Sequence, residues 1–298
     1  MTSSERTPRQ YAIIEAPSVL GLKPTGVDCL PDALLREGLA DRLKARRAAR
    51  LMPPPFSAEP DSQTQILNAS AIASWTPQLA DTVEAVLDAG EFPLVLGGDC
   101  SILLGPALAL KRRGRFGLLF IDGHADFYQA EANPTGEAAS MDLALAAGYG
   151  PALLCDLEGR GPLVRSGDVV AFGFRDEDEQ GEYGSQPLPA DVLALDLRSV
   201  RRMGASAAAR AAMARLSHGA LDGFFIHLDA DSLHDDVMPA VDYRLPDGLT
   251  IDEMREILEM AVSGTRAVGM EVTIYNPALD NDGRAARALV NLLVAALA

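Results

Sequence analysis

The sequence LLFIDGHAD at residues 118–126 joins a short apolar run to three side chains that can bind a metal. The run at residues 118–121 is too short for an ordinary helix and lies between glycines, so it predicts a buried parallel strand. The polar side chains follow at intervals of two residues: Asp122, His124 and Asp126. Because residues two apart on an extended segment point the same way, these groups would converge just past the carboxyl end of the strand, where open α/β sheets bind ligands.

Two carboxylates and an imidazole in one small volume repel or desolvate one another unless a cation lies between them. This combination of oxygen and nitrogen atoms suits a hard to borderline divalent metal such as Mn²⁺. On its own the pattern is weak, because acidic residues and histidines at strand ends also cap helices or bind water. A metal site is therefore predicted only if other parts of the chain supply further ligands.

A second stretch, FPLVLGGDCS at residues 92–101, predicts a short strand, a sharp glycine turn and the start of a helix. Asp99 and Ser101 can cap that helix, while Cys100 can be an ordinary small buried side chain. Alternatively, Cys100 is a thiolate at the helix N-terminus, where its pKa falls and it can bind a metal. Taken alone, this stretch favours the first interpretation.

A third stretch, GFFIHLDADSLHDDVMP at residues 223–239, predicts another buried strand that ends in acidic residues. Asp229 and Asp231 are again two residues apart, so two more carboxylates would point to the carboxyl edge of the sheet. Throughout the chain, predicted strands alternate with predicted helices, which indicates an α/β fold with a parallel sheet covered on both faces. No linker rich in proline, glycine or serine divides the interior, so we expect a single domain over residues 1–298.

Two other segments carry expectations that the structure can test. Residues 31–47 have apolar side chains at helical spacing, and the basic run KARRAAR at residues 44–50 resembles one face of a solvated helix. Residues 127–140 form a long polar segment after DGHAD, of a length that is typical of a substrate loop or lid.

The formal net charge of −16 argues against a nucleic-acid or anionic-membrane partner, which leaves a small-molecule substrate as the expected partner. The chain has three cysteines, a small and odd number that fits a reducing compartment better than a disulfide framework. The first twenty residues contain no apolar signal segment, and no long apolar run occurs elsewhere. We therefore expect a cytoplasmic protein.

The motifs GGDCS, DGHAD, HLDADSLHDDVMPA and EVTIYNP have the order and spacing of the motifs of the arginase/agmatinase (ureohydrolase) family, which read GGDHS, DAHxD, SxDxDxxDPxxxP and EVNP. The chain resembles this family over residues 92–277. The resemblance implies a three-layer α/β/α fold with an eight-stranded, mainly parallel sheet, and a homo-oligomer, either a trimer or a hexamer. It also implies two Mn²⁺ ions per chain and hydrolysis of a C–N bond in a small guanidino, ureido or formimino compound.

The resemblance assigns the metal ligands residue by residue. The six expected ligands are Cys100, Asp122, His124, Asp126, Asp229 and Asp231. Asp122 and Asp229 would bridge both ions. Asp126 and Cys100 would complete the ligands of one ion, and His124 and Asp231 would complete those of the other. Two divalent ions can generate a nucleophile at neutral pH and stabilise a tetrahedral intermediate. Asp126 would also accept the proton of the nucleophile.

The sequence departs from the family pattern at three places. Cys100 replaces a histidine, which could weaken Mn²⁺ binding or favour a softer ion. With a cysteine at this position, the chain resembles the branch of the family that includes hydroxyarginine amidinohydrolase. The loop after DGHAD lacks the histidine that shuttles protons in arginases, and its nearest positions are Ala139 and Ser140. An alignment on AsnPro without a gap places Ile274 where the family has a guanidinium-binding glutamate, so Glu271, three residues upstream, is the candidate for that catalytic role. Residues three apart on a strand face opposite sides, so Glu271 could take that place only at a bulge.

Two interpretations of function remain. The first is a binuclear metal hydrolase, and the second is a catalytically impaired subunit of the same fold with a structural or regulatory role. Five of the six ligand types are kept, and an abandoned site should lose its clustered carboxylates first. The sequence therefore favours the enzyme, but it does not identify the substrate.

Overall fold

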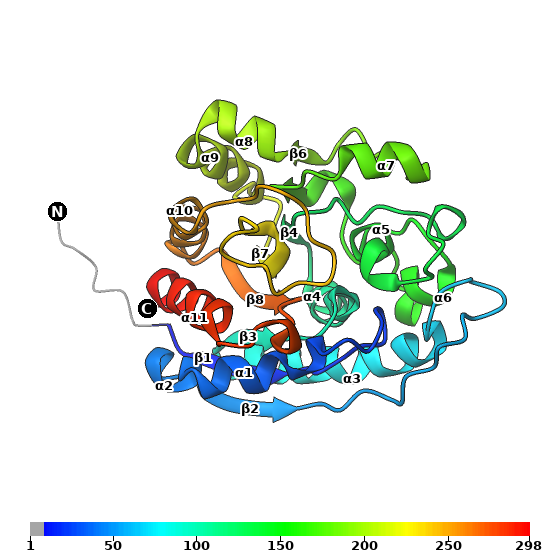
Figure 1. The fold of residues 1–298 in the computed structure, drawn as a ribbon, viewed down its shortest axis with the longest axis horizontal. Coiled ribbons are helices and arrows are strands. Elements are labelled where there is room, and N and C mark those ends of the chain that lie inside the picture. Colours follow the sequence, from blue (N-terminus) through cyan, green and yellow to red (C-terminus); the bar gives the residue numbers. More distant parts are fainter. Residues whose placement is uncertain (1–8) are drawn as a thin grey trace.

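The computed structural model describes residues 9–298, and its centre is one eight-stranded sheet in the order β2-β1-β3-β8-β7-β4-β5-β6 (Figure 1). Every pair of neighbouring strands is parallel, so the predicted sheet is confirmed. The strands are β1 (Tyr11–Glu15), β2 (Arg46–Arg50), β3 (Phe92–Leu96), β4 (Phe116–Ile121), β5 (Val169–Phe172), β6 (Leu193–Leu195), β7 (Gly223–Asp229) and β8 (Ala267–Thr273).

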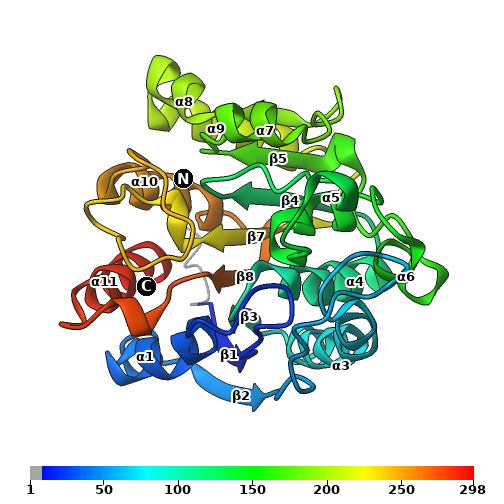
Figure 2. The ribbon, with the colours of Figure 1, turned by 45° about the vertical axis from the view of Figure 1, so that its right-hand side comes forward.

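Helices cover both faces of the sheet (Figure 2). The helices that supply buried side chains to one face are α1 (Leu30–Arg36), α2 (Leu39–Leu43), α8 (Leu197–Met203), α9 (Ala205–Leu216), α10 (Ile251–Val262) and α11 (Arg284–Leu297). The helices that supply the other face are α3 (Ala69–Asp88), α4 (Leu104–Arg113), α5 (Asp142–Ala146) and α6 (Ala152–Cys155). The remaining helix, α7 (Glu177–Tyr183), has no buried residue.

The strands are apolar because both of their faces are buried. In β4, Leu119 and Ile121 join the hydrophobic core on one side of the sheet, while Leu118 and Phe120 join the core on the other. This alternation follows from the two-residue repeat of a strand, and it explains why the central strands read as continuous hydrophobic runs.

The helix expected over residues 31–47 is wrong in its second half. The chain leaves α2 at Lys44, which has a positive φ of 52°, and then forms the edge strand β2. Arg47 and Arg50 of this strand bind the buried carboxylate of Glu15 on β1. Pairing with β1 and with this carboxylate overrides the local helical pattern, so the basic run is not a solvated helix face.

None of the described helices is long and apolar enough to cross a membrane. The segment at residues 127–140 contains only two short 3₁₀ turns, η3 (Ala130–Ala132) and η4 (Ala138–Met141). It is therefore mostly loop, as expected.

Candidate metal centre

The three predicted stretches meet at the carboxyl edge of the sheet, where β3, β8, β7 and β4 are successive neighbours. Asp122 follows β4, and Asp229 is the last residue of β7. Cys100 begins the short 3₁₀ helix η2 (Cys100–Leu103), which follows β3 after a glycine turn. Parallel strands bring their carboxyl ends to one edge, so segments far apart in the sequence supply one site.

One group of possible ligands consists of Cys100, Asp122, His227 and Asp229, all of them buried. Their ligand atoms lie within 4.8 Å of one another. Cys100 Sγ donates to Asp229 Oδ2 at 2.8 Å and lies 3.3 Å from Thr273 Oγ1. This group therefore offers oxygen, nitrogen and sulfur atoms to a single ion.

A second group consists of Asp122, His124 and Asp231, and its ligand atoms also lie within 4.8 Å of one another. His124 Nδ1 is 2.9 Å from Asp231 Oδ2 and 3.7 Å from Asp122 Oδ1. Asp122 belongs to both groups, which is the position of a bridging ligand.

The buried atoms of this site fit a divalent cation. Asp122 Oδ2 and His227 Nε2 have no hydrogen-bond partner among the described residues, and they lie 3.5 Å apart. Unpaired buried polar atoms are unfavourable, and a metal ion would bind both. Carboxylate oxygens with imidazole nitrogens suit Mn²⁺, and the thiol of Cys100 also suits a softer ion.

The electrostatics of the metal-free site show why a cation is needed. Burial, together with the neighbouring carboxylates Asp231 and Asp122, raises the pKa of Asp229 well above its usual range. Burial also raises the pKa of Asp126, with Asp122 adding to the effect. Burial alone would lower the pKa of His124, but Asp231 raises it above its usual value. Protons thus neutralise the cluster when no metal does so.

His227 is a member of the site that the sequence did not single out. It lies on β7 two residues before Asp229, so both side chains point to the same face of the strand. Its Nδ1 hydrogen-bonds to Glu271 Oε1 at 2.8 Å, and its ring stacks on Phe120 with 4.5 Å between the ring centroids. Metal-binding histidines usually have such a carboxylate on the second ring nitrogen. The two-residue spacing was the available signal, but the apolar run around His227 concealed it.

Glu271 does not lie at the cavity. Its side chain is fully buried on β8, opposite His227, and it is not among the residues that line the cavity beside the metal centre. Ile274 lines the cavity instead, with a positive φ of 68°. Glu271 therefore reaches the centre only through His227, and its catalytic role stays a prediction.

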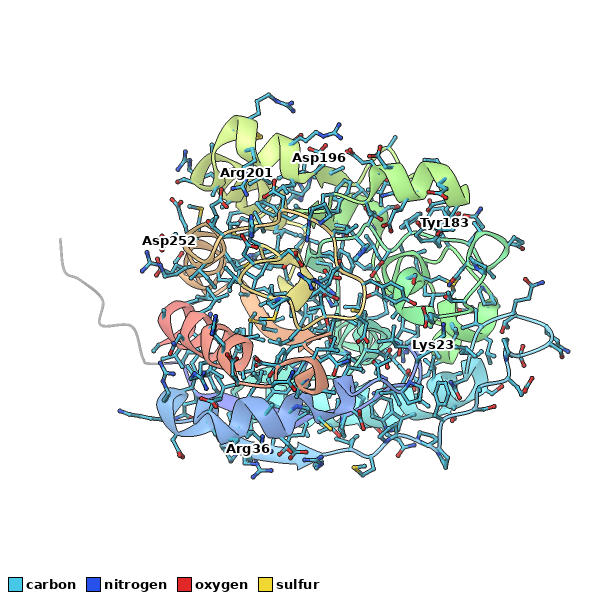
Figure 3. The ribbon with its side chains drawn as sticks, viewed as in Figure 1. Lys23, Arg36, Tyr183, Asp196, Arg201 and Asp252 are labelled. Carbon is cyan, nitrogen blue, oxygen red and sulfur yellow. The ribbon has the colours of Figure 1, made fainter. Side chains whose placement is uncertain are left out.

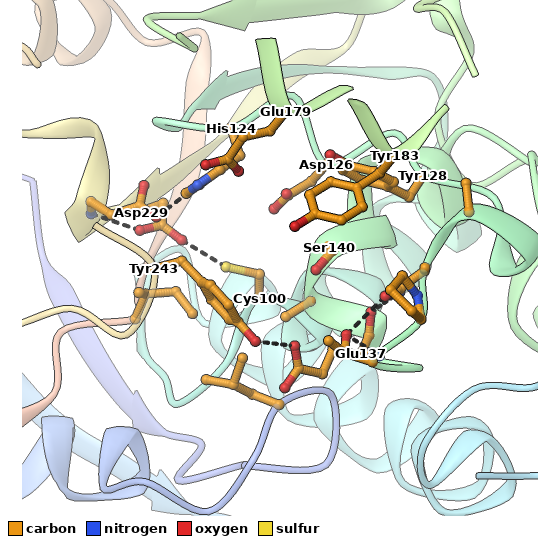
Figure 4. Close-up of a pocket in the computed structure, with 18 residues that line it drawn as sticks. Cys100, His124, Asp126, Tyr128, Glu137, Ser140, Glu179, Tyr183, Asp229 and Tyr243 are labelled. Carbon is orange, nitrogen blue, oxygen red and sulfur yellow. Dashed lines mark hydrogen bonds and ion pairs between the residues drawn. The ribbon is translucent and has the colours of Figure 1, made fainter. Parts of the chain in front are cut away.

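The cavity beside the centre has a volume of about 260 Å³, and both polar and apolar side chains line its walls (Figure 4). Five of the six expected ligands line it: Cys100, His124, Asp126, Asp229 and Asp231. Asp126 is buried, has a positive φ of 45°, and belongs to neither ligand group. Its role as a ligand thus stays a prediction, while its place in the cavity agrees with a role in catalysis.

The loop at residues 127–140 forms much of the cavity wall. Tyr128, Glu137 and Ser140 line the cavity, as do the neighbouring side chains of Tyr183 and Tyr243. Phe127 packs against Tyr149 with 5.2 Å between the ring centroids, which anchors the start of the loop. The expected substrate loop is therefore adjacent to the centre.

A parallel α/β sheet that groups possible ligands for divalent cations beside a cavity is the architecture of a metal-dependent hydrolase of the ureohydrolase class. The model of the Arginase family matches residues 9–298. The chain belongs to the arginase family, and this confirms the resemblance that its motifs predicted.

Several relatives are similar over almost their whole length. The arginase of Bacillus caldovelox is 29% identical over 96% of this chain and 97% of its own. The arginase of Bacillus subtilis (strain 168) is 28% identical over 96% of each chain. Among solved structures, the arginase of Bacillus caldovelox has a TM-score of 0.86 at 27% identity, covering 97% of this chain and 98% of its own. The arginase of Bacillus cereus has a TM-score of 0.84 at 28% identity, with the same coverage.

Proposed function

We propose that this enzyme is a binuclear metal hydrolase that uses Mn²⁺ to cleave a C–N bond of a small guanidino, ureido or formimino compound. The observation that carries the proposal is the pair of ligand groups that share Asp122 at the carboxyl edge of the sheet. The similarity to arginases over almost the whole chain supports the same chemistry.

The first ion would be held by Cys100, Asp122, His227 and Asp229, and the second by Asp122 with His124 and Asp231. His227 thereby takes a place in the first set that the motifs had assigned to Asp126. Asp126 would then be free to act on the substrate from the cavity wall.

Two divalent ions supply a nucleophile at neutral pH and stabilise the charge that develops when a planar carbon is attacked. The chain supplies the remaining functions. Burial and Asp122 raise the pKa of Asp126, so its carboxyl oxygens can take up a proton and deliver it within the cavity. The loop at residues 127–140 forms much of the cavity wall, so it would contact the substrate and limit the access of bulk water, which would strengthen electrostatic interactions at the centre.

The alternative function, a catalytically impaired subunit, receives no support from the described residues. The ligand atoms are grouped and buried, although grouping and burying these charged side chains is unfavourable when no cation is bound. The enzyme therefore remains the proposal.

Metal content and turnover test this proposal together. Protein purified with Mn²⁺ should contain about two ions per chain and release urea or ammonia from at least one member of a panel of guanidino, ureido and formimino compounds. The Asp229→Ala variant should lose the first ion and all activity. Two bound ions with no turnover of the panel would support the impaired subunit instead, and full activity of Asp229→Ala would contradict the assigned site.

A further inference from the structure

Ile274 lines the cavity just after β8 in a backbone conformation that isoleucine rarely adopts. Its φ is 68°, and the amide of Tyr275 donates to the carbonyl of Thr273 at 2.8 Å, so Ile274 is the central residue of a three-residue turn. Such a turn with a positive φ is rare and strained, and a β-branched side chain adds to the strain. Strained residues persist where the surrounding structure holds them, and they cluster at functional sites.

The neighbours of Ile274 hold this turn against the metal centre. The amide of Ile274 donates to the Gly98 carbonyl at 2.9 Å, and Gly98 lies two residues before Cys100. On the other side of the same thiol, Thr273 Oγ1 lies 3.3 Å from Cys100 Sγ. The strained turn therefore places an apolar side chain in the cavity wall, next to a possible metal ligand.

The carboxylate of Glu137 is not available to a ligand in this cavity. Its side chain is only 1% exposed, and its Oε2 accepts a hydrogen bond from Tyr243 Oη at 2.5 Å (Figure 4). Lys23, on the loop after β1 (Figure 3), lies with its Nζ 3.9 Å from Glu137 Oε1. Glu137 therefore serves the structure of the wall and leaves no oxygen free for a substrate.

The other carboxylates of the cavity also leave no buried counter-ion for a cation. Asp229 and Asp231 would bind metal in the proposed hydrolysis, and Asp126 would take up a proton. Glu179 is exposed on α7, a helix without buried residues, so solvent weakens any ion pair that it forms. Burying an unpaired cation against an apolar wall is unfavourable, whereas an uncharged group can lie there at much lower cost. The wall formed by Ile274 therefore suits an uncharged reacting group.

We propose that Ile274 selects a substrate whose reacting group carries no charge, so that the enzyme cleaves the ureido group of a substituted urea in preference to a guanidinium group. This inference rests on the proposed function and narrows its substrate class. In the reaction, the oxygen of water bonds to the carbonyl carbon of the ureido group, and the bond from that carbon to its terminal nitrogen breaks. One proton of the water passes through Asp126 to the departing nitrogen, so the products are ammonia and the carbamic acid of the remaining amine.

Matched substrates test the inference in the metal-loaded enzyme. They are an n-alkylurea and the n-alkylguanidine with the same chain, compared over several chain lengths. We expect kcat/KM of the wild type to favour the urea by at least about tenfold, because the guanidinium would be buried without a partner. Ile274→Glu should shift this ratio toward the guanidine on the order of tenfold to a hundredfold, as for a hydrogen bond between charged groups.

The matched control variant is Ile274→Gln, which has the size and polarity of the glutamate variant without its charge. It should not shift the ratio toward the guanidine. Mn²⁺ content should be the same in all three proteins, because Ile274 belongs to neither ligand group.

A second readout needs no turnover of the substrates. The uncharged n-alkylcarboxamide and the cationic n-alkylamidine are planar mimics of the two reacting groups. In calorimetry, the Mn²⁺-loaded wild type should bind the carboxamide more tightly than the amidine. Ile274→Glu should bind the amidine more tightly than Ile274→Gln does. The wild-type comparison stands even if a polar side chain at position 274 prevents folding.

The outcomes separate the two proposals. A wild-type preference for the guanidine and the amidine would overturn the inference and leave the hydrolase standing. Equal shifts in Ile274→Glu and Ile274→Gln would show that charge at this position does not set selectivity, which would also overturn it. Two bound ions without turnover of either substrate would contradict the proposed function, while calorimetry would still decide the inference. A wild type that binds no Mn²⁺ would contradict both.

Discussion

At the scale of single residues, His227 connects two buried carboxylates on neighbouring segments. Its Nδ1 is 2.8 Å from Glu271 Oε1, and its Nε2 is 3.5 Å from Asp122 Oδ2. Burial alone would lower the pKa of His227, but the nearby carboxylates of Asp122 and Glu271 raise it to about 10. The imidazolium thus takes the place of a cation in the metal-free protein, and a bound ion would displace its Nε2 proton.

The variant His227→Ala should weaken the first metal site while leaving the second in place. Loss of His227, a ligand that Glu271 supports through a hydrogen bond, should reduce the affinity for the first ion by at least about tenfold to a hundredfold. Metal titration followed by elemental analysis measures this. His234→Ala is the control, because His234 is partly exposed and belongs to neither ligand group. Two ions bound with wild-type affinity in His227→Ala would show that His227 is not a ligand.

The variant Cys100→His should retain or tighten Mn²⁺ binding. Burial and the carboxylate of Asp229 raise the pKa of the Cys100 thiol, so forming the thiolate that binds metal is unfavourable. A neutral imidazole needs no such deprotonation and suits Mn²⁺ better than sulfur. Competition between Mn²⁺ and Zn²⁺ measures the change, with Cys29→Ser, at an exposed position, as the control. Loss of Mn²⁺ binding in Cys100→His would contradict this account of the ligand.

At the scale of elements, the edge strand β2 is held by its arginines. Arg47 donates to Glu15 Oε1 from Nε at 2.8 Å and from Nη2 at 2.6 Å, and Arg50 Nη1 donates to Oε2 at 2.9 Å. Charged side chains on an edge strand also discourage pairing with other chains. The same residues thus fix the strand and protect the edge.

The variant Glu15→Ala should destabilise the protein by about 1–3 kcal/mol, because it removes a buried acceptor of charged hydrogen bonds. Urea unfolding measures the free energy of unfolding. Arg46→Ala is the control, since Arg46 is half exposed and binds the surface residue Glu91, and its loss should change stability by less than about 1 kcal/mol. Equal effects of the two substitutions would mean that the buried pair does not hold β2.

At the scale of the whole molecule, the core is built around a charged centre. The carboxylates of the centre are buried at the end of a continuous apolar sheet, so their charge affects the stability of the entire fold. Metal, pH and stability are therefore coupled in this protein.

The metal-free protein should be more stable at about pH 6 than at about pH 8. The raised pKa of His227, about 10 against an unfolded value of about 6.5, contributes stability that is complete below the unfolded value and is lost as the pH rises toward 10. The raised pKa values of Asp126 and Asp229 act in the same direction. Burial alone would raise the pKa of Asp122, but His124 and His227 lower it to about 2. The contribution of Asp122 to stability is therefore lost only below about pH 4, outside this range.

Thermal unfolding in the presence of EDTA measures the effect, which should be on the order of 2 kcal/mol for His227 alone. Added Mn²⁺ should stabilise the protein more at the higher pH, since its ligands bind metal in their deprotonated forms. A melting temperature of the metal-free protein that rises between these two pH values would contradict the assigned protonation.

The local pattern of residues was sufficient to predict most of the fold and most of the site. Apolar runs of strand length, each followed by acidic residues at two-residue spacing, predicted β4, β7 and the carboxylates at their ends. The helix over residues 31–47 failed because β2 depends on pairing with β1, which local periodicity does not report. The expectation of a trimer or hexamer stays a prediction.

The sequence by itself determined which side chains lie at the carboxyl ends of buried strands, because the two-residue repeat and the order of motifs are local properties. Only the tertiary structure decided that His227 joins the possible ligands, that Glu271 hydrogen-bonds to His227 from β8, and that Glu137 lines the cavity. Each of these three depends on which segments become neighbours. That is settled by strand order and loop packing between residues far apart in the chain.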